Sequence, residues 1–407
     1  MSDIFCQGFS RPLRLADCEQ ILPSLKAFMG RWPMDVVPSD DTNEAVITLT
    51  GRDDGLYVLK TPWLAEELET ESPTKVLCNL AVDLVSAWLE ESSGVFGLHG
   101  AAVEFSGRLV VFPNTNHAGK SLLTAALMAK GFTAYSDDLL AVTPAGRGRS
   151  FGFPPRLRLP WPDLAEKLGQ YLETHLAFPD RHYCFVKTEG PELASFGQER
   201  PIGAVVVLDR KAEKCPAELI PVTSEAGLKA LVNRYLLRPG QARKALLVSQ
   251  KMLRGLPVWR LRYDSLEEAT TILMEAFGPT PAWGFQNHDR RPPLPKPGAE
   301  PPHLAPSPKS TYKTKHLARR RYACRRNVLL VAEGEAAFLV SPDGDRIFHL
   351  NQIGSLVWRM MGEPLSQVEA ASLLLEVFPG QHPDRIAEDI RIIFEDLIEN
   401  GLIVRSN

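Results

Sequence analysis

The stretch Arg108-Leu-Val-Val-Phe-Pro-Asn-Thr-Asn-His-Ala-Gly-Lys-Ser121 decides the fold of the larger part of the chain. Its first residues form a short apolar run that is typical of a buried strand, and turn-forming residues follow from position 113 to 118. Gly119 then opens a run of good helix formers. A strand, a loop and a helix in this order are the layout of a nucleotide site, in which N–H groups of the loop and the helix N-terminus would face the phosphates. We therefore predict these nucleotide-binding residues: Asn114, Thr115, Asn116, His117, Ala118, Gly119, Lys120, Ser121 and Leu122.

Two residues of this motif have defined chemical roles. Lys120 would reach the β- and γ-phosphate oxygens of ATP, and the hydroxyl of Ser121 would bind Mg²⁺. The phosphate-loop pattern G-x-x-x-x-G-K-[ST] requires Gly at position 114, where this chain has Asn114. Asn tolerates left-handed backbone better than most residues, so the turn can be kept. The motif alone also fits an ordinary helix start, and the departure at Asn114 leaves the strength of nucleotide binding open.

A pair of acidic residues strengthens the nucleotide interpretation. Asp137 and Asp138 follow a strand-like segment, Phe132–Tyr135, one helix downstream of the loop. If this strand is a parallel neighbour of the first one, both loops lie at the same edge of the sheet. Acidic side chains there can hold Mg²⁺ and accept a proton from a hydroxyl nucleophile. We predict Ser121, Asp137 and Asp138 as metal ligands; for the two aspartates, a solvated turn is the alternative.

Residues around the loop resemble a known family. Leu98-His99-Gly100-Ala-Ala-Val, then Asn-His-Ala-Gly-Lys-Ser, then a helix ending at Gly131, then Tyr135-Ser-Asp-Asp138 resemble the catalytic core of HPr kinase/phosphorylase. The resemblance implies an α/β, phosphoenolpyruvate-carboxykinase-like P-loop kinase fold and the phosphorylation of a Ser or Thr hydroxyl with ATP and Mg²⁺. No further segment matches the phosphorylase half of the family's chemistry. Kinases of this group often form oligomers, so the resemblance makes a homo-oligomer an expectation.

The resemblance also implies catalytic residues. His99 matches a catalytic or phosphate-contacting histidine, although a buried imidazole at a strand end fits the position as well. Lys120 matches the lysine that binds the nucleotide. Asp137 and Asp138 match residues that share the base and metal roles, and the sequence does not separate the two.

Arginines downstream are further candidates. Arg156 and Arg158 lie in a Pro-rich segment of the kind that positions arginines beside a phosphate, and two surface arginines explain the pattern equally well. In HPr-kinase-like proteins a later arginine assists catalysis. Arg234 and Arg238 would share one face of a helix predicted at residues 224–237, and we take Arg234 as the catalytic candidate.

Composition bounds the class of protein. With 407 residues, of which 44% are hydrophobic and 23% charged, the chain can bury more than one core, which predicts two or three domains. The net charge of −3 argues against a nucleic-acid binder. No apolar run reaches the length of a membrane span and no signal sequence opens the chain, so we expect a cytoplasmic protein without a membrane partner. The six cysteines lack C-x-x-C spacing, which favours neither zinc nor disulfides.

Changes in composition divide the chain. Residues 1–74 are predicted to form an α/β preface to the kinase domain, and residues 75–277 its core. Residues 278–326 are a linker, first Pro-rich and therefore extended, then basic, with eight Lys or Arg and no acid from Lys309 to Arg326. Such a run is usually a solvated segment, and attraction for an acidic peptide is the functional alternative. Residues 327–407 form a separate small domain.

The pattern of this last domain is compact. Ala336–Val340 and Arg346–Leu350 flank Pro-Asp-Gly-Asp, a strong hairpin signal. Asn351 can cap a helix to Met361, Ser366-Gln-Val-Glu369 is a capping box, and a third helix from Asp384 to Asn400 has an apolar face. Two or three strands with three helices of this size predict a winged-helix α+β domain.

This domain resembles the PqqD family. The residues that carry the resemblance are Phe348-His-Leu-Asn351, Gly354, Trp358 and the run from Asp396 to Gly401. PqqD-like domains, or RiPP recognition elements, bind the leader of a ribosomally made precursor peptide, which the resemblance implies here for residues 327–407. The peptide would add as a strand to the hairpin edge and place apolar side chains against the third helix. The predicted peptide contacts are Arg346, Ile347, Phe348, His349, Leu350, Ile390 and Phe394. A small domain that only packs against the kinase or mediates dimers is the alternative.

Together these patterns favour one function and leave two others open. The favoured function is an ATP- and Mg²⁺-dependent kinase that phosphorylates a Ser or Thr hydroxyl of a precursor peptide, or of a small protein, held by its own C-terminal domain. The second is a nucleotide-binding regulator of peptide capture that transfers no phosphate, which the Asn114 departure keeps open. The third is a kinase for a small metabolite or saccharide.

Overall fold

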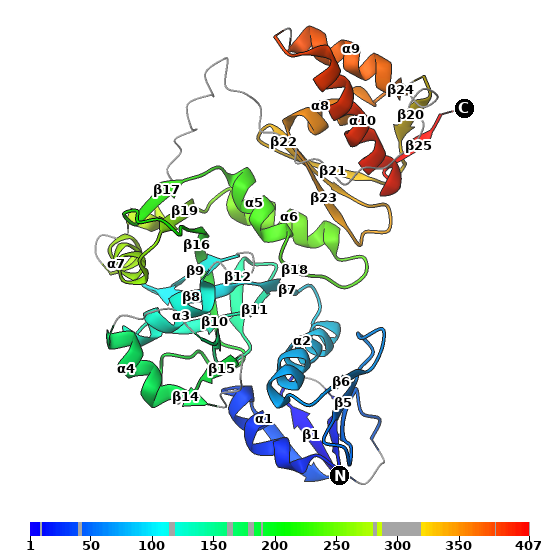
Figure 1. Ribbon diagram of the computed structural model, residues 1–407. Coiled ribbons are helices and arrows are strands. Elements are labelled where there is room, and N and C mark those ends of the chain that lie inside the picture. Colours follow the sequence, from blue (N-terminus) through cyan, green and yellow to red (C-terminus); the bar gives the residue numbers. More distant parts are fainter. Residues whose placement is uncertain are drawn as a thin grey trace. The chain divides into compact units, whose positions relative to one another are not determined.

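The computed structural model of the chain forms two compact units (Figure 1). It describes residues 1–8, 10–39, 43–113, 119–160, 166–177, 183–188, 190–279, 283–286, 319–378 and 380–406. Unit 1 comprises Met1–Leu236 and Lys251–Asp289, and unit 2 comprises Leu237–Gln250 and Arg290–Asn407. The predicted loop residues Asn114, Thr115, Asn116, His117 and Ala118 lie outside the described residues, as does most of the predicted linker.

Unit 1 begins with a six-stranded sheet in the order β3-β1-β2-β4-β5-β6. The strands on either side of Gly51-Arg-Asp-Asp-Gly55 pair antiparallel, as the turn-forming residues between them favour. The elements are β1 (Ser2–Cys6), β2 (Leu13–Ala16), η1 (Glu19–Ile21), α1 (Leu22–Met29), β3 (Met34–Pro38), β4 (Ile47–Gly51), β5 (Tyr57–Lys60), β6 (Leu68–Thr70) and α2 (Pro73–Glu91). Ser72 caps the start of helix α2 by accepting a hydrogen bond from Lys75 N–H at 3.2 Å.

The second sheet of unit 1 has ten strands among the described residues, and its main path is β10-β8-β9-β16-β12-β11-β7-β18. Off this path, β19 pairs with β16, and β17 pairs with β19. Strand β9 runs parallel to β16, which runs parallel to β19. The strands are β7 (Phe96–His99), β8 (Ala101–Phe105), β9 (Arg108–Phe112), β10 (Ala134–Ser136), β11 (Leu139–Val142), β12 (Arg147–Ser150), β16 (Glu199–Arg210), β17 (Glu218–Pro221), β18 (Tyr235–Leu236) and β19 (Val258–Tyr263).

Helices and a small third sheet complete this unit. The short sheet has the order β13-β15-β14. Helices α3 and α7 pack against each other and against strands of the ten-stranded sheet. The elements are α3 (Lys120–Ala129), β13 (Arg156–Arg158), α4 (Glu166–His175), β14 (Leu176–Ala177), β15 (Tyr183–Val186), α5 (Ser224–Val232), α7 (Leu266–Phe277) and η2 (Trp283–Phe285).

Two sequence-based expectations about unit 1 are corrected. Strand β10 is not the direct neighbour of β9, because β8 lies between them; both are antiparallel to β8, so they still run in the same direction and end at the same side of the sheet. The helix expected at residues 224–237 ends at Val232, since Tyr235 and Leu236 pair with β7 instead. Arg234 and Arg238 therefore do not share a helix face.

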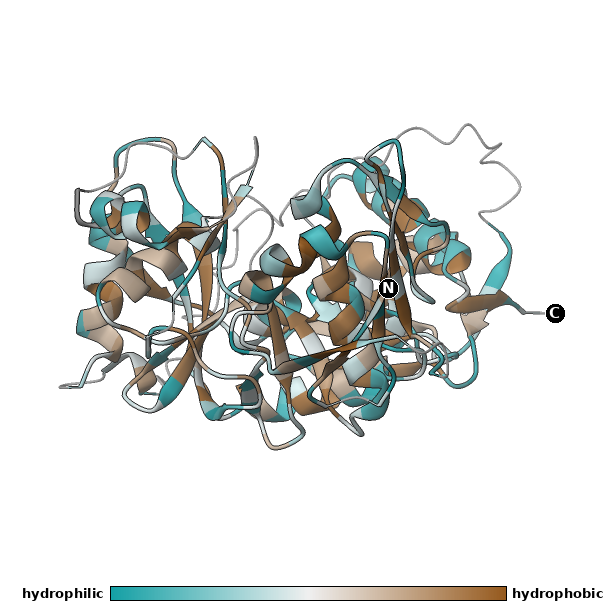
Figure 2. Ribbon diagram, turned by 90° about the horizontal axis from the view of Figure 1, so that it is seen from below, coloured by the Kyte–Doolittle hydropathy of each residue, from teal (hydrophilic) through white to brown (hydrophobic). Residues whose placement is uncertain are grey.

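One hydrophobic core joins the N-terminal sheet to the second sheet. Ile4, Leu25 and Leu84 from the first elements are buried in the same cluster as Leu139 and Phe185. Hydrophobic residues, brown in Figure 2, are concentrated in the strands and the helices that pack on them. Burial of this kind is the main favourable contribution to folding, so residues 1–74 are stabilised together with the elements that follow.

Unit 2 confirms the predicted local elements of the C-terminal domain. The hairpin pairs antiparallel, Asn351 accepts a hydrogen bond from Gly354 N–H at 2.9 Å, and Ser366 with Glu369 forms the capping box. The sequence analysis missed the sheet β24-β20-β25. The elements are β20 (Arg321–Cys324), β21 (Leu329–Glu333), β22 (Ala336–Val340), β23 (Ile347–Leu350), α8 (Gln352–Met360), β24 (Leu365–Ser366), α9 (Gln367–Val377), α10 (Pro383–Glu399) and β25 (Ile403–Arg405).

A segment from the middle of the chain belongs to unit 2. It carries the first part of α6 (Ala242–Leu253). Ala242 N–H donates to the carbonyl of Gly344 at 3.0 Å, Gly240 N–H to Asp345 Oδ1 at 2.6 Å, and the Gln250 amide to the carbonyl of Ala332 at 2.9 Å. Across the part of the chain that is described, none of the helices combines the length and the apolar character needed to cross a membrane.

Candidate functional site

The candidate site lies where β7, β9 and β10 end, at one side of the second sheet. Gly100, which links β7 to β8, donates its N–H to the carbonyl of Asp138 at 3.0 Å. The hydroxyl of Ser136 donates back to the carbonyl of Gly100 at 2.7 Å. These two hydrogen bonds fix the turn that carries His99 against the turn that carries Asp137 and Asp138.

The start of α3 supplies the cationic group. Gly119 occupies the N-cap position with φ +83°, in the left-handed region that favours glycine. Lys120 follows as the first helical residue, and its side chain is only 9% exposed. Burial lowers the pKa of Lys120, and the charges of Asp137 and Asp138 oppose this shift. Leu122 packs its side chain against a core cluster, so only its backbone could contribute to a phosphate site.

Asp137 is a buried carboxylate, and one of its oxygens has no hydrogen-bond partner among the described residues. Its side chain is 6% exposed. Oδ2 accepts the backbone N–H of Arg156 at 3.1 Å, whereas Oδ1 is buried and has no hydrogen-bond partner among the described residues. Burial and the charge of Asp138 raise the pKa of Asp137 to about 6, although the Arg156 N–H and the nearby Ser121 hydroxyl act in the opposite direction.

Asp138 differs from its neighbour because it has cationic partners. Its Oδ1 lies 2.5 Å from His99 Nε2, and its Oδ2 accepts from Arg156 Nη2 at 3.4 Å. Burial would raise the pKa of Asp138, but the hydrogen bond to His99 and the charges of Arg156 and Lys120 outweigh burial and lower it. The structure thus separates two aspartates that the sequence leaves equivalent: Asp138 is paired, and Asp137 has an unused oxygen.

The arginines named in the sequence analysis have different places. Arg156, at the start of β13, lies in the site and contacts both aspartates, and its guanidinium also lies 5.1 Å from the ring centre of Tyr183. Arg158 lies over the same ring at 5.9 Å. Arg234 is close enough to Lys120 for its charge to lower the lysine pKa, and its carbonyl accepts the His99 N–H at 2.7 Å. Arg238 belongs to unit 2.

The donor set at the end of β10 fits a hard divalent cation. Mg²⁺ binds proteins through one or two carboxylates and hydroxyls and keeps waters and phosphate oxygens as its other ligands. The hydroxyl of Ser121 and the carboxylates of Asp137 and Asp138 are oxygen ligands of this kind. Within the described ranges, no three or more His, Cys, Asp or Glu side chains form a cluster that could hold a metal alone.

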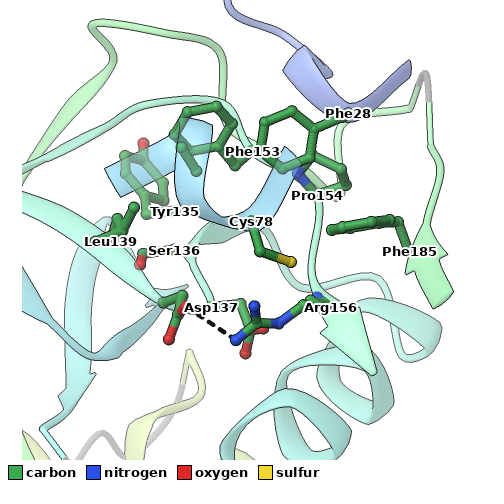
Figure 3. A pocket seen from close by; sticks show the side chains of 12 residues that line it. Phe28, Cys78, Tyr135, Ser136, Asp137, Leu139, Phe153, Pro154, Arg156 and Phe185 are labelled. Carbon is green, nitrogen blue, oxygen red and sulfur yellow. Dashed lines mark hydrogen bonds and ion pairs between the residues drawn. The ribbon is translucent and has the colours of Figure 1, made fainter. Parts of the chain in front are cut away.

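A cavity borders the two aspartates. Figure 3 shows the rings of Phe28, Phe153 and Phe185 at one end of it and the side chains of Asp137 and Arg156 at the other. Its lining also includes Cys78 and Ala81 of α2 and Leu139 of β11. Phe28 comes from α1, so the N-terminal elements form part of this wall. Sequence reasoning missed the cavity, because residues distant along the chain build it.

In unit 2, β23 is an edge strand of the sheet β21-β22-β23 among the residues that the structure describes. Phe348 and Leu350 of β23 are half-buried against the domain core. Ile390 and Phe394 of α10, predicted as peptide contacts, are instead core residues: Phe394 is 0% exposed, and its ring centre lies 5.8 Å from that of Tyr322. They offer no exposed surface to a peptide because they lie on the inward face of the helix.

Comparison with known proteins bears on this unit. Residues 336–403 match the family described as "Coenzyme PQQ synthesis protein D (PqqD)". Unit 2 contains a PqqD domain. The matched residues include β22, β23 and all three helices from α8 to α10, so the PqqD match covers the predicted hairpin and the predicted third helix.

A solved structure is also similar to part of the chain. It is described as "TbiB1 in Complex with the TbiA(beta) Leader Peptide", with 16% sequence identity and a TM-score of 0.19, and the alignment covers 20% of this chain and 93% of that chain. No curated protein matches the chain in sequence. The PqqD match does not include unit 1, so the HPr kinase resemblance of that unit stays a prediction.

Proposed function

We propose that the chain is an ATP- and Mg²⁺-dependent kinase that phosphorylates a Ser or Thr hydroxyl of a peptide held by its PqqD domain. The observation that carries the proposal is the group formed by Lys120, Ser121, Asp137 and Asp138 at the ends of β9 and β10. Burying a carboxylate oxygen without a partner is costly. Such an arrangement is expected where a ligand completes the site.

The side chains have distinct roles in the proposed reaction. Asp137 accepts the proton of the acceptor hydroxyl. A carboxylate whose pKa is about 6 is mostly ionised at pH 7, and its pKa is near enough to the working pH for it to act as a general base. The hydroxyl oxygen forms a bond to the γ-phosphorus of ATP, the bond from that phosphorus to the β–γ bridging oxygen breaks, and ADP leaves. Lys120 and Arg156 place positive charge near the phosphate oxygens, and Mg²⁺ would supply further charge neutralisation.

Asp138 and His99 act as a positioning pair in this scheme. Their contact of 2.5 Å orients both side chains, and the His99 backbone is fixed by the carbonyl of Arg234. Because Asp138 carries its own cationic partners, its negative charge is partly compensated. This leaves Asp137 as the carboxylate that faces the hydroxyl.

The PqqD domain supports the peptide half of the proposal. The edge strand β23 offers backbone groups for strand addition along Arg346, Ile347, Phe348, His349 and Leu350. Unlike the core residues of α10, all four β23 side chains are half-buried. Because the PqqD domain and the proposed kinase unit belong to one chain, a peptide bound by the domain has a raised effective concentration at the site.

Label transfer from γ-labelled ATP tests the proposal. The full-length chain is incubated with the short peptides encoded beside its gene, and phosphate on each peptide is measured. Lys120→Ala and Asp137→Asn should reduce transfer at least a hundredfold. The matched control is Lys130→Ala, just beyond the other end of α3, where the lysine forms an ion pair with Glu267 at 2.7 Å.

The outcomes are distinct. Transfer that persists in both site variants, or that is absent from every peptide, would refute the kinase assignment. If ATP instead changes peptide affinity while no phosphate appears on the peptide, the non-catalytic regulator is the better description of the protein.

A further inference from the structure

The cavity beside Asp137 has a polar end and an apolar end. Asp137 and Arg156 form the polar end (Figure 3). At the apolar end, the rings of Phe28 and Phe153 are stacked with centres 5.2 Å apart, and the ring of Phe185 meets Phe28 edge-on at 5.4 Å. A ligand that fills this cavity therefore has a polar group next to Asp137 and an apolar body behind it.

The size of the cavity limits the occupant. Its volume is about 40 Å³. One water-sized group needs roughly 10–15 Å³ on this measure, so the cavity holds about three or four such groups. The side chains of Val, Leu and Ile have this number of carbon atoms. An adenine ring has more than twice as many atoms, so the nucleotide base does not fit here.

We propose that this cavity selects the substrate: it receives a Val, Leu or Ile side chain adjacent to the acceptor Ser or Thr of the peptide. The inference rests on the proposed function, because it places the acceptor hydroxyl at the unused oxygen of Asp137. Since Asp137 also lines the cavity, a neighbouring residue of the same peptide reaches the apolar end. The inference further gives the N-terminal elements a role, because Phe28 of α1 and Ala81 of α2 form its walls.

Peptide preference tests the proposal directly. Short synthetic peptides with one Ser, whose two neighbours are both Ala, both Leu, both Phe or both Asp, are compared as substrates of the full-length chain. A buried methylene is worth a factor of about four, and Leu has three more carbons than Ala. We expect kcat/KM for the Leu peptide to exceed that for the Ala and Asp peptides at least tenfold. Equal values, or a preference for Asp, would overturn the proposal.

Two variants should change the preference in opposite directions. Ala81→Leu fills the cavity, so the advantage of the Leu peptide over the Ala peptide should fall below threefold while ATP affinity stays within twofold. Phe153→Leu enlarges the apolar end away from the aspartates, so the Phe peptide should gain at least fivefold relative to the Leu peptide. If neither variant shifts the order of the peptides, the cavity does not select the neighbour.

A labelling experiment separates failure of this inference from failure of the kinase proposal. Cys78 lines the cavity and is half-buried, and Cys215 is a half-buried thiol that does not line it. The Leu peptide should slow alkylation of Cys78 at least fivefold and leave Cys215 unchanged, as measured by mass spectrometry. Protection without phosphate transfer would keep the binding site and refute the kinase. Transfer without protection would keep the kinase and refute the site.

Discussion

Gly119 is the residue whose substitution tests the geometry of the α3 start most sharply. Its φ of +83° is unfavourable for residues with a Cβ, and a Cβ built there would lie 2.9 Å from the hydroxyl oxygen of Tyr263. Gly131, just after the other end of α3, has a similar φ of +85°, but a Cβ there meets no heavy atom within 4 Å among the described residues. Gly131→Ala is therefore a matched control for Gly119→Ala, because the contact with Tyr263 is the only close one that differs; the Arg210 side chain, at 3.6 Å from the Cβ built at Gly119, is at an ordinary van der Waals distance.

The structure sets the expected difference in stability between Gly119→Ala and Gly131→Ala. Left-handed backbone costs a non-glycine residue about 1–2 kcal/mol, and both variants carry this cost. Forcing an extra methyl group into a filled space costs about 1–3 kcal/mol more, and only Gly119→Ala carries that. At roughly 2–4 °C per kcal/mol for a unit of this size, Gly119→Ala should melt roughly 2–12 °C below Gly131→Ala. ATP affinity should also fall at least tenfold in Gly119→Ala and stay unchanged in Gly131→Ala.

Scanning calorimetry and isothermal titration with ATP and Mg²⁺ provide both measurements. The decisive experiment removes the Tyr263 hydroxyl oxygen, which the new methyl group would contact. The double variant Gly119→Ala, Tyr263→Phe should lose about 1–2 kcal/mol less free energy of unfolding than the sum of the two single variants. The reasoning fails if Gly119→Ala is no less stable than Gly131→Ala, or if the double variant shows no coupling. Either result would mean that the left-handed start of α3 and its contact with Tyr263 do not constrain position 119.

Two further predictions concern other parts of the chain. Burial raises the pKa of Asp83 in α2 to about 6 from an ordinary 3.8, so the folded protein holds this proton more tightly and the free energy of unfolding should fall as pH rises from about 4 to about 6. Asp83→Asn should remove this pH dependence in calorimetry and add up to roughly 3 kcal/mol at pH 7.5; an unchanged profile would contradict it. In the PqqD domain, Phe348→Asp should weaken binding of the precursor peptide about tenfold in fluorescence anisotropy and leave ATP affinity unchanged. Val368→Asp, on an exposed position of α9, is its control, and equal losses in the two variants would rule out a specific role for β23.

Local signals predicted the elements of the PqqD domain well, and long-range pairing explains where prediction of unit 1 went wrong. Capping by Asn351 and Ser366 depends on residues three positions apart, which the sequence displays directly. In contrast, the helix predicted to reach residue 237 stops at Val232 because β18 pairs with β7 more than a hundred positions earlier. Sheet pairing with a distant strand overrides local helix propensity, and no pattern within residues 224–237 reports it.

The same distinction applies to the site. Lys120, Asp137 and Asp138 were recognisable because they lie close together in the sequence at positions with known spacing. The two aspartates differ in their pairing: Asp138 contacts the side chains of His99 and Arg156, which come from other strands. The burial of Phe394 depends on Tyr322, far from it in sequence, so its apolar periodicity alone could not separate a core residue from a peptide contact.

The charge balance at the ends of β9 and β10 is a further argument for an anionic ligand. Lys120, Arg156 and Arg234 bring three positive charges close together; burial is the main cause that lowers the pKa of Lys120, the two aspartates raise it, and the two arginines lower it further. Asp137 and Asp138 supply only two negative charges, and one of these is engaged by His99. A triphosphate would bind the cationic side chains, while a divalent cation would be held between its phosphate oxygens, the Ser121 hydroxyl and the aspartates. The nucleotide alone would leave the aspartates without a cation, and Mg²⁺ alone would leave the cationic side chains without an anion. Nucleotide and Mg²⁺ should therefore bind cooperatively.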